Sequence, residues 1–114
     1  MTIKEYTKCC KETLSYENPD IALHCAIGLS TEAGEILDAY KKSRFYGRSL
    51  NVQNVIEEAG DIMWYLALLA DFYGHTLEDI MEANIQKLSK RYPNGFFQDV
   101  INRDVENELS HIKG

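Results

Sequence analysis

Apolar residues recur every three or four positions along most of this chain, which is the spacing of one face of an α-helix. No segment shows the alternation of apolar and polar residues that is typical of a half-buried strand. The pattern predicts helices over about 2–15, 21–42 and 52–73, a fourth from Thr76 to near Arg91, and a last, polar helix over about 97–112.

The connections between these helices carry turn-forming residues. Pro19 precedes the second helix, Gly47 lies at the centre of a predicted loop over 43–51, and Gly74 fits the position just after the third helix. Pro93 cannot continue the fourth helix. Short connections favour antiparallel neighbours. We therefore predict an all-α fold, an antiparallel bundle of four to five helices in a single domain.

Composition and charge narrow the classes of partner. A chain of 114 residues suits one domain, and 45% hydrophobic residues is ordinary for a globular protein. The formal net charge of −6 would repel the phosphates of nucleic acid, so we expect no nucleic-acid partner. No apolar leader segment and no apolar stretch of about 18 residues is present. We expect a cytoplasmic protein without membrane contact. The three cysteines have no spacing typical of a zinc site or a disulfide framework.

Two acidic motifs carry the candidate chemistry. The second predicted helix contains Glu32-Ala33-Gly34-Glu35, and the third contains Glu58-Ala59-Gly60-Asp61. Acids three residues apart share a helix face, where like charges oppose each other. At about 100° per residue, the acids of the third helix fall on the same stripe as Tyr65 and Leu68, which should face inward. The acids of the second helix share a sector with Gly28 and Lys42, next to an apolar sector with Ala33 and Tyr40.

A single acid on an amphipathic helix is usually solvated, but two pairs on inward stripes of neighbouring helices need another explanation. Four carboxylates cannot all stay ionised and unpaired in a bundle interior. A divalent cation between them resolves this conflict, and ligands that are all oxygen favour Mg²⁺ or Mn²⁺ over zinc.

The fourth predicted helix has a basic face. Asn84, Lys87 and Arg91 share it, and Tyr92 lies just beyond. Amide, ammonium and guanidinium groups suit phosphate oxygens, although a solvated basic face has the same pattern. Lys42 shares a face with Glu35 and is a further candidate for a phosphate contact.

Three other residues are weaker candidates. Trp64 is a candidate to stack on a base, although an aromatic residue in a helix more often belongs to the core. His24 is more often a packed or exposed histidine than a ligand. Asn54 shares the face of Glu58 and is a candidate for contact with metal-bound water.

Three segments of the chain together resemble the MazG-like all-α nucleoside triphosphate pyrophosphohydrolase family. They are residues 27–35 and 58–66, which carry the acidic motifs, and 84–93, which carries the basic face. The resemblance covers about 20–97. It implies an all-α bundle completed by assembly into a homodimer or homotetramer. It also implies Mg²⁺-dependent release of pyrophosphate from a nucleoside or deoxynucleoside triphosphate, with Mn²⁺ as a possible substitute.

The resemblance also implies roles for single residues. The metal ligands and catalytic residues would be Glu32, Glu35, Glu58 and Asp61. The substrate-binding residues would be Lys42, Trp64, Asn84, Lys87, Arg91 and Tyr92. Our mechanistic hypothesis is attack of water at the α-phosphorus, with Glu32 or Glu35 orienting or deprotonating that water. Lys87 and Arg91 would stabilise the charge that builds on the leaving pyrophosphate.

Two other functions were weighed against this one. A ferritin-like di-iron site needs Glu-x-x-His on two helices, and the chain has one such match, at Glu108 and His111. A non-catalytic helical module that binds a nucleotide or a protein partner is the second alternative. The cost of clustering four carboxylates argues against it. Base and sugar specificity, the number of metal ions and the choice between dimer and tetramer stay open.

Overall fold

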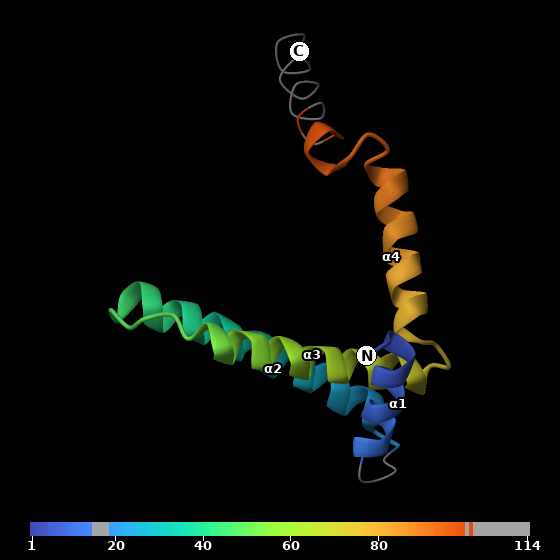
Figure 1. Ribbon diagram of the computed structural model, residues 1–114, viewed down its shortest axis with the longest axis horizontal. Helices are drawn as coiled ribbons and strands as arrows, with labels where there is room; N and C mark the ends of the chain where they lie inside the picture. The colour runs from blue at the N-terminus through green and yellow to red at the C-terminus, as the bar shows by residue number, and fades with distance from the viewer. Residues whose placement is uncertain (15–18, 100, 102–114) are drawn as a thin grey trace. The chain divides into compact units, whose positions relative to one another are not determined.

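The computed structural model describes residues 1–14, 19–99 and 101, which contain four numbered helices (Figure 1). They are α1 (Ile3–Thr13), α2 (Ile21–Phe45), α3 (Val52–Phe72) and α4 (Leu77–Arg91). These described residues include no strand, so the predicted all-α fold is confirmed. Residues 96–99 are also helical, whereas most of the predicted polar helix over 97–112 lies outside the described residues.

The chain divides into two compact units, the first Met1–Glu78 and the second starting at Asp79. The first unit contains α1, α2 and α3, and most of α4 belongs to the second. In the second unit, the buried Asp99 carboxylate accepts a hydrogen bond from the Asn94 backbone N–H at 3.1 Å, just after the predicted helix stop at Pro93. None of the described helices is long and apolar enough to cross a membrane.

Local signals in the sequence explain where α1 and α3 begin and end. Thr2 and Glu5 form a capping box at the start of α1, each side chain accepting from the other's backbone N–H at 3.1 and 3.0 Å. Asn51 caps α3. After α3, Gly74 has φ of 76°, and its N–H and that of His75 donate back to carbonyls in the last turn. This is the glycine-terminated helix end that the sequence predicts.

The end of α2 corrects the sequence prediction. The helix continues beyond Lys42 to Phe45, so the connection to α3 is shorter than the predicted loop over 43–51. Residues 43–45 include no glycine or proline that would end a helix. The backbone leaves the helical conformation around Gly47, whose φ is 65°. The polar residues Ser43 and Arg44 suit a loop, but here they belong to an exposed helix end.

Helices α2 and α3 lie side by side and antiparallel (Figure 1). Ile21 and Cys25 at the start of α2 join Ala67 and Leu68 near the end of α3 in the buried core. Cys10 of α1 also belongs to this core, and α1 packs mainly on α3. The core of the first unit therefore lies at one end of the α2–α3 pair.

One glycine sets how closely α2 and α3 approach. Gly28 is buried, and a Cβ atom at its position would lie 2.2 Å from Cζ of Tyr65. The Tyr65 ring therefore rests directly on the α2 backbone. Glycine in a helix interior costs about 1 kcal/mol of stability relative to alanine. Close packing against Tyr65 explains why glycine occupies position 28.

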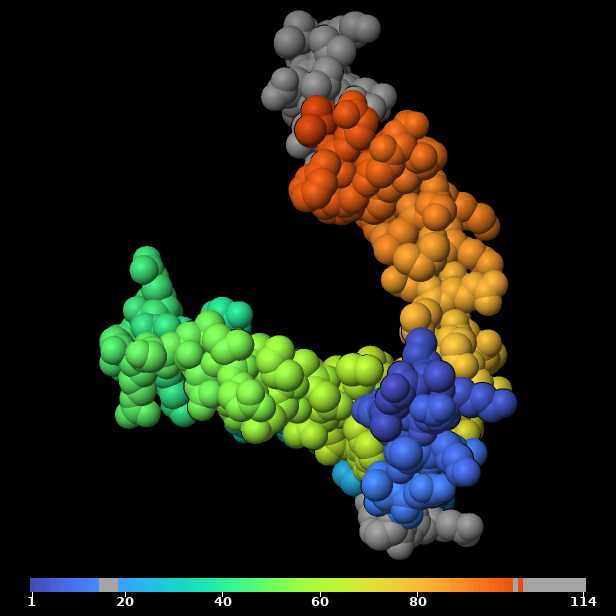
Figure 2. All heavy atoms as spheres, in the orientation of Figure 1, coloured from blue at the N-terminus to red at the C-terminus, as the bar shows by residue number. Residues whose placement is uncertain are grey.

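The other end of the pair leaves large apolar side chains in solvent. Leu37 is 70% exposed, Phe45 76% and Ile56 61%. In the view of Figure 2, no other helix of the first unit lies over the green part of the pair. An apolar surface of this kind on one chain is typical of a surface that another protein covers.

Candidate functional site

Three carboxylates come together near the middle of the α2–α3 pair. Glu32 of α2 and Glu58 and Asp61 of α3 each offer an oxygen, and these oxygens lie within 4.8 Å of one another. The contact between Gly28 and Tyr65 explains why. One turn along α2 from Gly28 is Glu32, and one turn back along antiparallel α3 from Tyr65 is Asp61. The predicted convergence of acids from two helices is therefore present for these three residues.

The stripe of α2 that faces α3 is the one that carries Glu32. The sector of Gly28 and Glu32 is itself the inner one, since Gly28 is buried and Glu32 half-buried. In the neighbouring apolar sector, Leu29 and Ile36 are half-buried, whereas Ala33 and Tyr40 are exposed. The packing stripe runs through small residues and then into the acids, because small residues allow the closer approach.

The neighbouring carboxylates change the pKa of Glu58. A hydrogen bond with Glu32 raises the pKa of Glu58 from 4.5 to about 7, and partial burial and the charges of Glu32, Asp61 and Glu57 add to this effect. Without a cation, Glu58 therefore holds a proton more readily than an isolated glutamic acid does. A group of oxygens that repel each other in this way fits a hard divalent cation, which would take the place of the shared proton.

Glu35, the fourth predicted ligand, lies outside this group of three. It is exposed and lines a neighbouring cavity of about 330 Å³. The cavity lies between the last turns of α2, the connection after it and the first turn of α3. Asn54, the weaker candidate for a water contact, also lines it.

Two basic side chains, those of Lys42 and Arg48, also line this cavity. Lys42, a predicted phosphate contact, pairs with Asp38 at 2.8 Å. This hydrogen bond lowers the pKa of Asp38, and the charges of Lys42, Lys41 and Arg48 lower it further. Arg48 lines the cavity from the connection, where its N–H donates to the Lys42 carbonyl at 3.4 Å. The sequence prediction missed Arg48, although its place one residue after the turn glycine could have indicated a chain that folds back on Lys42.

Trp64 lies in the first unit against α1. Its Nε1–H donates to Thr13 Oγ1 at 2.8 Å, and its ring meets the Tyr65 ring edge-on with centroids 5.2 Å apart. It is half-buried beside the core. These contacts are those of a core aromatic residue, the alternative weighed for Trp64. His24, the other weak candidate, meets the Tyr65 ring edge-on at 6.0 Å.

The tyrosine of α1 reaches the second acidic motif. The Tyr6 hydroxyl donates to the Gly60 carbonyl at 3.5 Å. Burial raises the pKa of Tyr6 to about 12, and a hydrogen bond with Cys10 and the charge of Asp61 contribute. Tyr6 therefore stays neutral at physiological pH and acts here as a hydrogen-bond donor.

The predicted basic face lies on α4, in the second unit. Asn84, Lys87 and Arg91 are all exposed there. The Arg91 guanidinium lies 5.5 Å from the centroid of the Tyr92 ring. Tyr92 itself lines a small cavity together with Leu88 and Phe96, so it belongs to the apolar stripe beside the basic face.

Comparisons with known proteins agree with these features. Residues 23–96 match the family model of the MazG nucleotide pyrophosphohydrolase domain. The uncharacterized protein YvdC of Bacillus subtilis is 38% identical over 73 residues, which are 56% of this chain and 69% of that protein. The Gene 37 protein of Mycobacterium phage L5 is 33% identical over 79 residues, which are 66% of this chain and 69% of that protein. No solved structure gives a significant match. The matched region contains both acidic motifs and the basic face, and the chain belongs to the MazG nucleotide pyrophosphohydrolase family.

Proposed function

We propose that this protein hydrolyses a nucleoside or deoxynucleoside triphosphate to the monophosphate and pyrophosphate. One observation carries the proposal: carboxylates from both halves of the family's acidic motif converge within 4.8 Å on neighbouring helices. The carboxylates of Glu32, Glu58 and Asp61 would hold Mg²⁺, with Mn²⁺ as a substitute. When bound, the metal would offset phosphate charge and acidify a water molecule.

Glu35 supports a division of labour among the acids. Because it lies outside the group of three, its carboxylate is available as the general base that orients and deprotonates the attacking water. Glu58 is not a candidate for this role in the proposal, because its carboxylate would be engaged with the metal. Between the two bases that the sequence leaves open, the arrangement favours Glu35 over Glu32.

The cavity beside Glu35 suits the phosphates. Lys42 and Arg48 supply positive charge, and the side chains of Asn51 and Asn54 supply amide donors within the same 330 Å³ cavity. A phosphate oxygen would compete with Asp38 for the Lys42 ammonium. In this proposal Lys87 and Arg91 of α4, with Asn84 and Tyr92, bind the remaining phosphates or the sugar. Asn84, Lys87 and Arg91 are exposed in the second unit.

Assembly into a homodimer or homotetramer is part of the proposal. It is supported by the exposed apolar side chains at the end of the α2–α3 pair, such as Leu37 and Phe45. A partner that covers them would complete the bundle. Light scattering coupled to size exclusion would show a mass that is a multiple of 13.1 kDa, whereas a monomer at micromolar concentration would contradict this part.

The activity is tested with a panel of the common NTPs and dNTPs, with Mg²⁺ and a pyrophosphate assay. We expect pyrophosphate from at least one of them. Glu35→Gln and Asp61→Asn should each abolish turnover while keeping the helical circular dichroism. Glu57→Gln is the matched control, because Glu57 is an exposed acid next to the cluster but outside it. Nucleotide binding without any pyrophosphate release would favour the non-catalytic module instead.

A further inference from the structure

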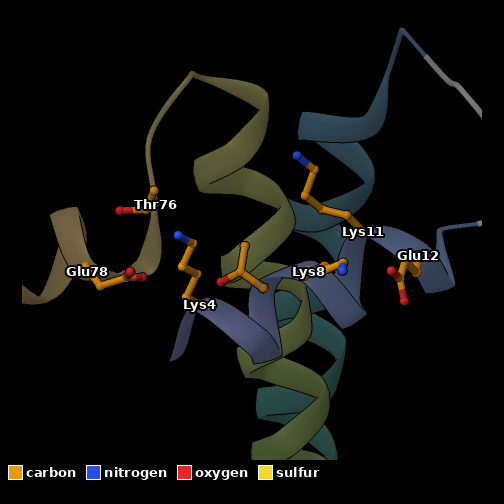
Figure 3. Close-up of a pocket in the computed structure, with 7 residues that line it drawn as sticks. Lys4, Lys8, Lys11, Glu12, Thr76 and Glu78 are labelled. Atoms are coloured by element: carbon orange, nitrogen blue, oxygen red, sulfur yellow. The ribbon is translucent and has the colours of Figure 1, made fainter. Parts of the chain in front are cut away.

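A second cavity lies in the first unit, on the outer face of α1. It has a volume of about 450 Å³, larger than the cavity beside Glu35. Lys4, Lys8 and Lys11 line it from α1, together with Thr7 (Figure 3). Thr76 contributes from the segment that follows α3. None of these residues belongs to the acidic or basic motifs discussed above.

The three lysines gather positive charge in a chain whose net charge is −6. They stand at positions i, i+4 and i+7 of one helix face, where like charges oppose each other. Lys11 pairs with Asp71 at 3.3 Å. Within the part of the chain that the structure describes, no carboxylate lies within 4.0 Å of the ammonium group of Lys4 or Lys8. Two ammonium groups on this face therefore have donors to offer to an anion.

A buried hydroxyl lies on the same face. Thr7 Oγ1 is shielded from solvent and has no hydrogen-bond partner among the described residues. A threonine in a helix usually donates to the carbonyl one turn earlier, as Thr31 does to Gly28 at 3.0 Å. Leaving a buried hydroxyl unsatisfied is unfavourable. Because the hydroxyl is shielded from solvent, rotation of the Thr7 side chain toward the cavity that it lines would bring it to a ligand oxygen.

Two acids at the edges of the cavity limit what it can hold. Glu12 and Glu78 line it as well, and in Figure 3 the Lys4 side chain reaches toward Thr76 and Glu78. The balance of three ammonium groups and two carboxylates does not suit a large polyanion. It suits a small molecule with one anionic group for the lysines and with hydroxyl or amino donors for the carboxylates. The volume falls within the range of small-molecule sites.

We propose that the outer face of α1 binds a small phosphate-bearing molecule through Lys4, Lys8 and the Thr7 hydroxyl. The inner face of the same helix carries Tyr6, which donates to the Gly60 carbonyl in the acidic motif. A ligand that holds α1 in place would therefore act on a helix that contacts the carboxylate site. The proposal does not depend on which triphosphate that site hydrolyses.

The test is calorimetric titration of the full chain with orthophosphate, pyrophosphate and a nucleoside monophosphate at constant ionic strength. EDTA is present, so that the carboxylate site holds no metal. We expect saturable binding of the monophosphate, about tenfold weaker in the Lys4→Gln/Lys8→Gln double variant. The control Arg44→Gln/Lys90→Gln removes the same charge from exposed positions elsewhere and should bind like the wild type.

Two further variants locate the site. Thr7→Val keeps the side-chain shape and removes the hydroxyl, and it should weaken binding about threefold or more at unchanged helical circular dichroism. Lys42→Gln/Arg48→Gln removes the cationic side chains of the cavity beside Glu35, and the monophosphate should still saturate the α1 site in this variant. The proposal is overturned if no probe saturates, if the lysine variant and its charge control bind alike, or if binding is lost only with Lys42 and Arg48.

Discussion

The two ends of the α2–α3 pair use the same helices for opposite purposes. At one end Cys25 and Leu68 are buried and α1 covers the pair. Two to three turns away, the same inner stripe carries Glu32 and Glu58, and the neighbouring carboxylates raise the pKa of Glu58. The first end stabilises the fold. At the second end, the clustered carboxylates need a proton or a cation to offset their charge. This difference shows where stability and activity should respond in opposite directions to substitution.

The largest expected effect is at the acidic end. Glu58→Gln should lower turnover about 100-fold or more, because a metal ligand and a charge are lost together. The same change should raise the midpoint of urea unfolding of the metal-free protein, because it removes a carboxylate that is costly to ionise. A variant that lost both activity and metal-free stability would contradict the division between the two ends.

At the packed end we expect the reverse. Gly28→Ala places a methyl group against the Tyr65 ring and should cost about 1–3 kcal/mol of unfolding free energy. Gly34→Ala is the matched control, since a Cβ at Gly34 meets nothing within 4 Å in the single chain. It should gain about 0.5–1 kcal/mol from helix propensity. Equal effects at the two glycines, measured by urea unfolding, would rule out the close packing at Gly28.

Proton and metal should compete at the acidic end. Because the pKa of Glu58 is about 7 in the fold and 4.5 ordinarily, the folded protein binds the extra proton between these values. Metal-free stability should therefore fall as the pH rises from about 4.5 to about 7. Mg²⁺ affinity should rise over the same range, by about tenfold per pH unit below 7. Calorimetry at pH 6 and 8 checks this, and a pH-independent affinity would contradict it.

The smallest effect concerns Trp64, which lies between the two ends. Trp64→Phe and Thr13→Val each remove the 2.8 Å hydrogen bond between these residues and should each cost about 1 kcal/mol. If Trp64 has only a packing role, KM should stay the same in both variants. A KM that rises in Trp64→Phe alone would instead support the stacking of Trp64 on a base. Urea unfolding and steady-state kinetics separate the two results.

Much of the fold follows from patterns that the sequence displays openly. The periodic apolar positions, Gly74 and Pro93 place all four helices, because helix stops depend on backbone conformations that few residues adopt. The predicted end of α2 at Lys42 is wrong, because polar residues such as Ser43 and Arg44 are equally suited to a loop and to an exposed helix end.

The candidate site was less accessible from the sequence. The acid pairs are visible as motifs, but the separation of Glu35 from the other three depends on the axial alignment of two helices. That alignment comes from Gly28 and Tyr65, which no local pattern connects. Arg48 lies in an irregular connection, where side-chain direction cannot be read from periodicity.

The contact between Gly28 and Tyr65 also has a consequence for transplanting this chemistry. Sliding α3 by one turn would move Asp61 by about 5.4 Å along the axis, further than the spread of the whole cluster. If only the two acidic motifs were grafted onto another helical hairpin, the ligands would be present, but the contact that aligns them along the helix axes would be missing. Gly28 and Tyr65 would have to be grafted together with the acids.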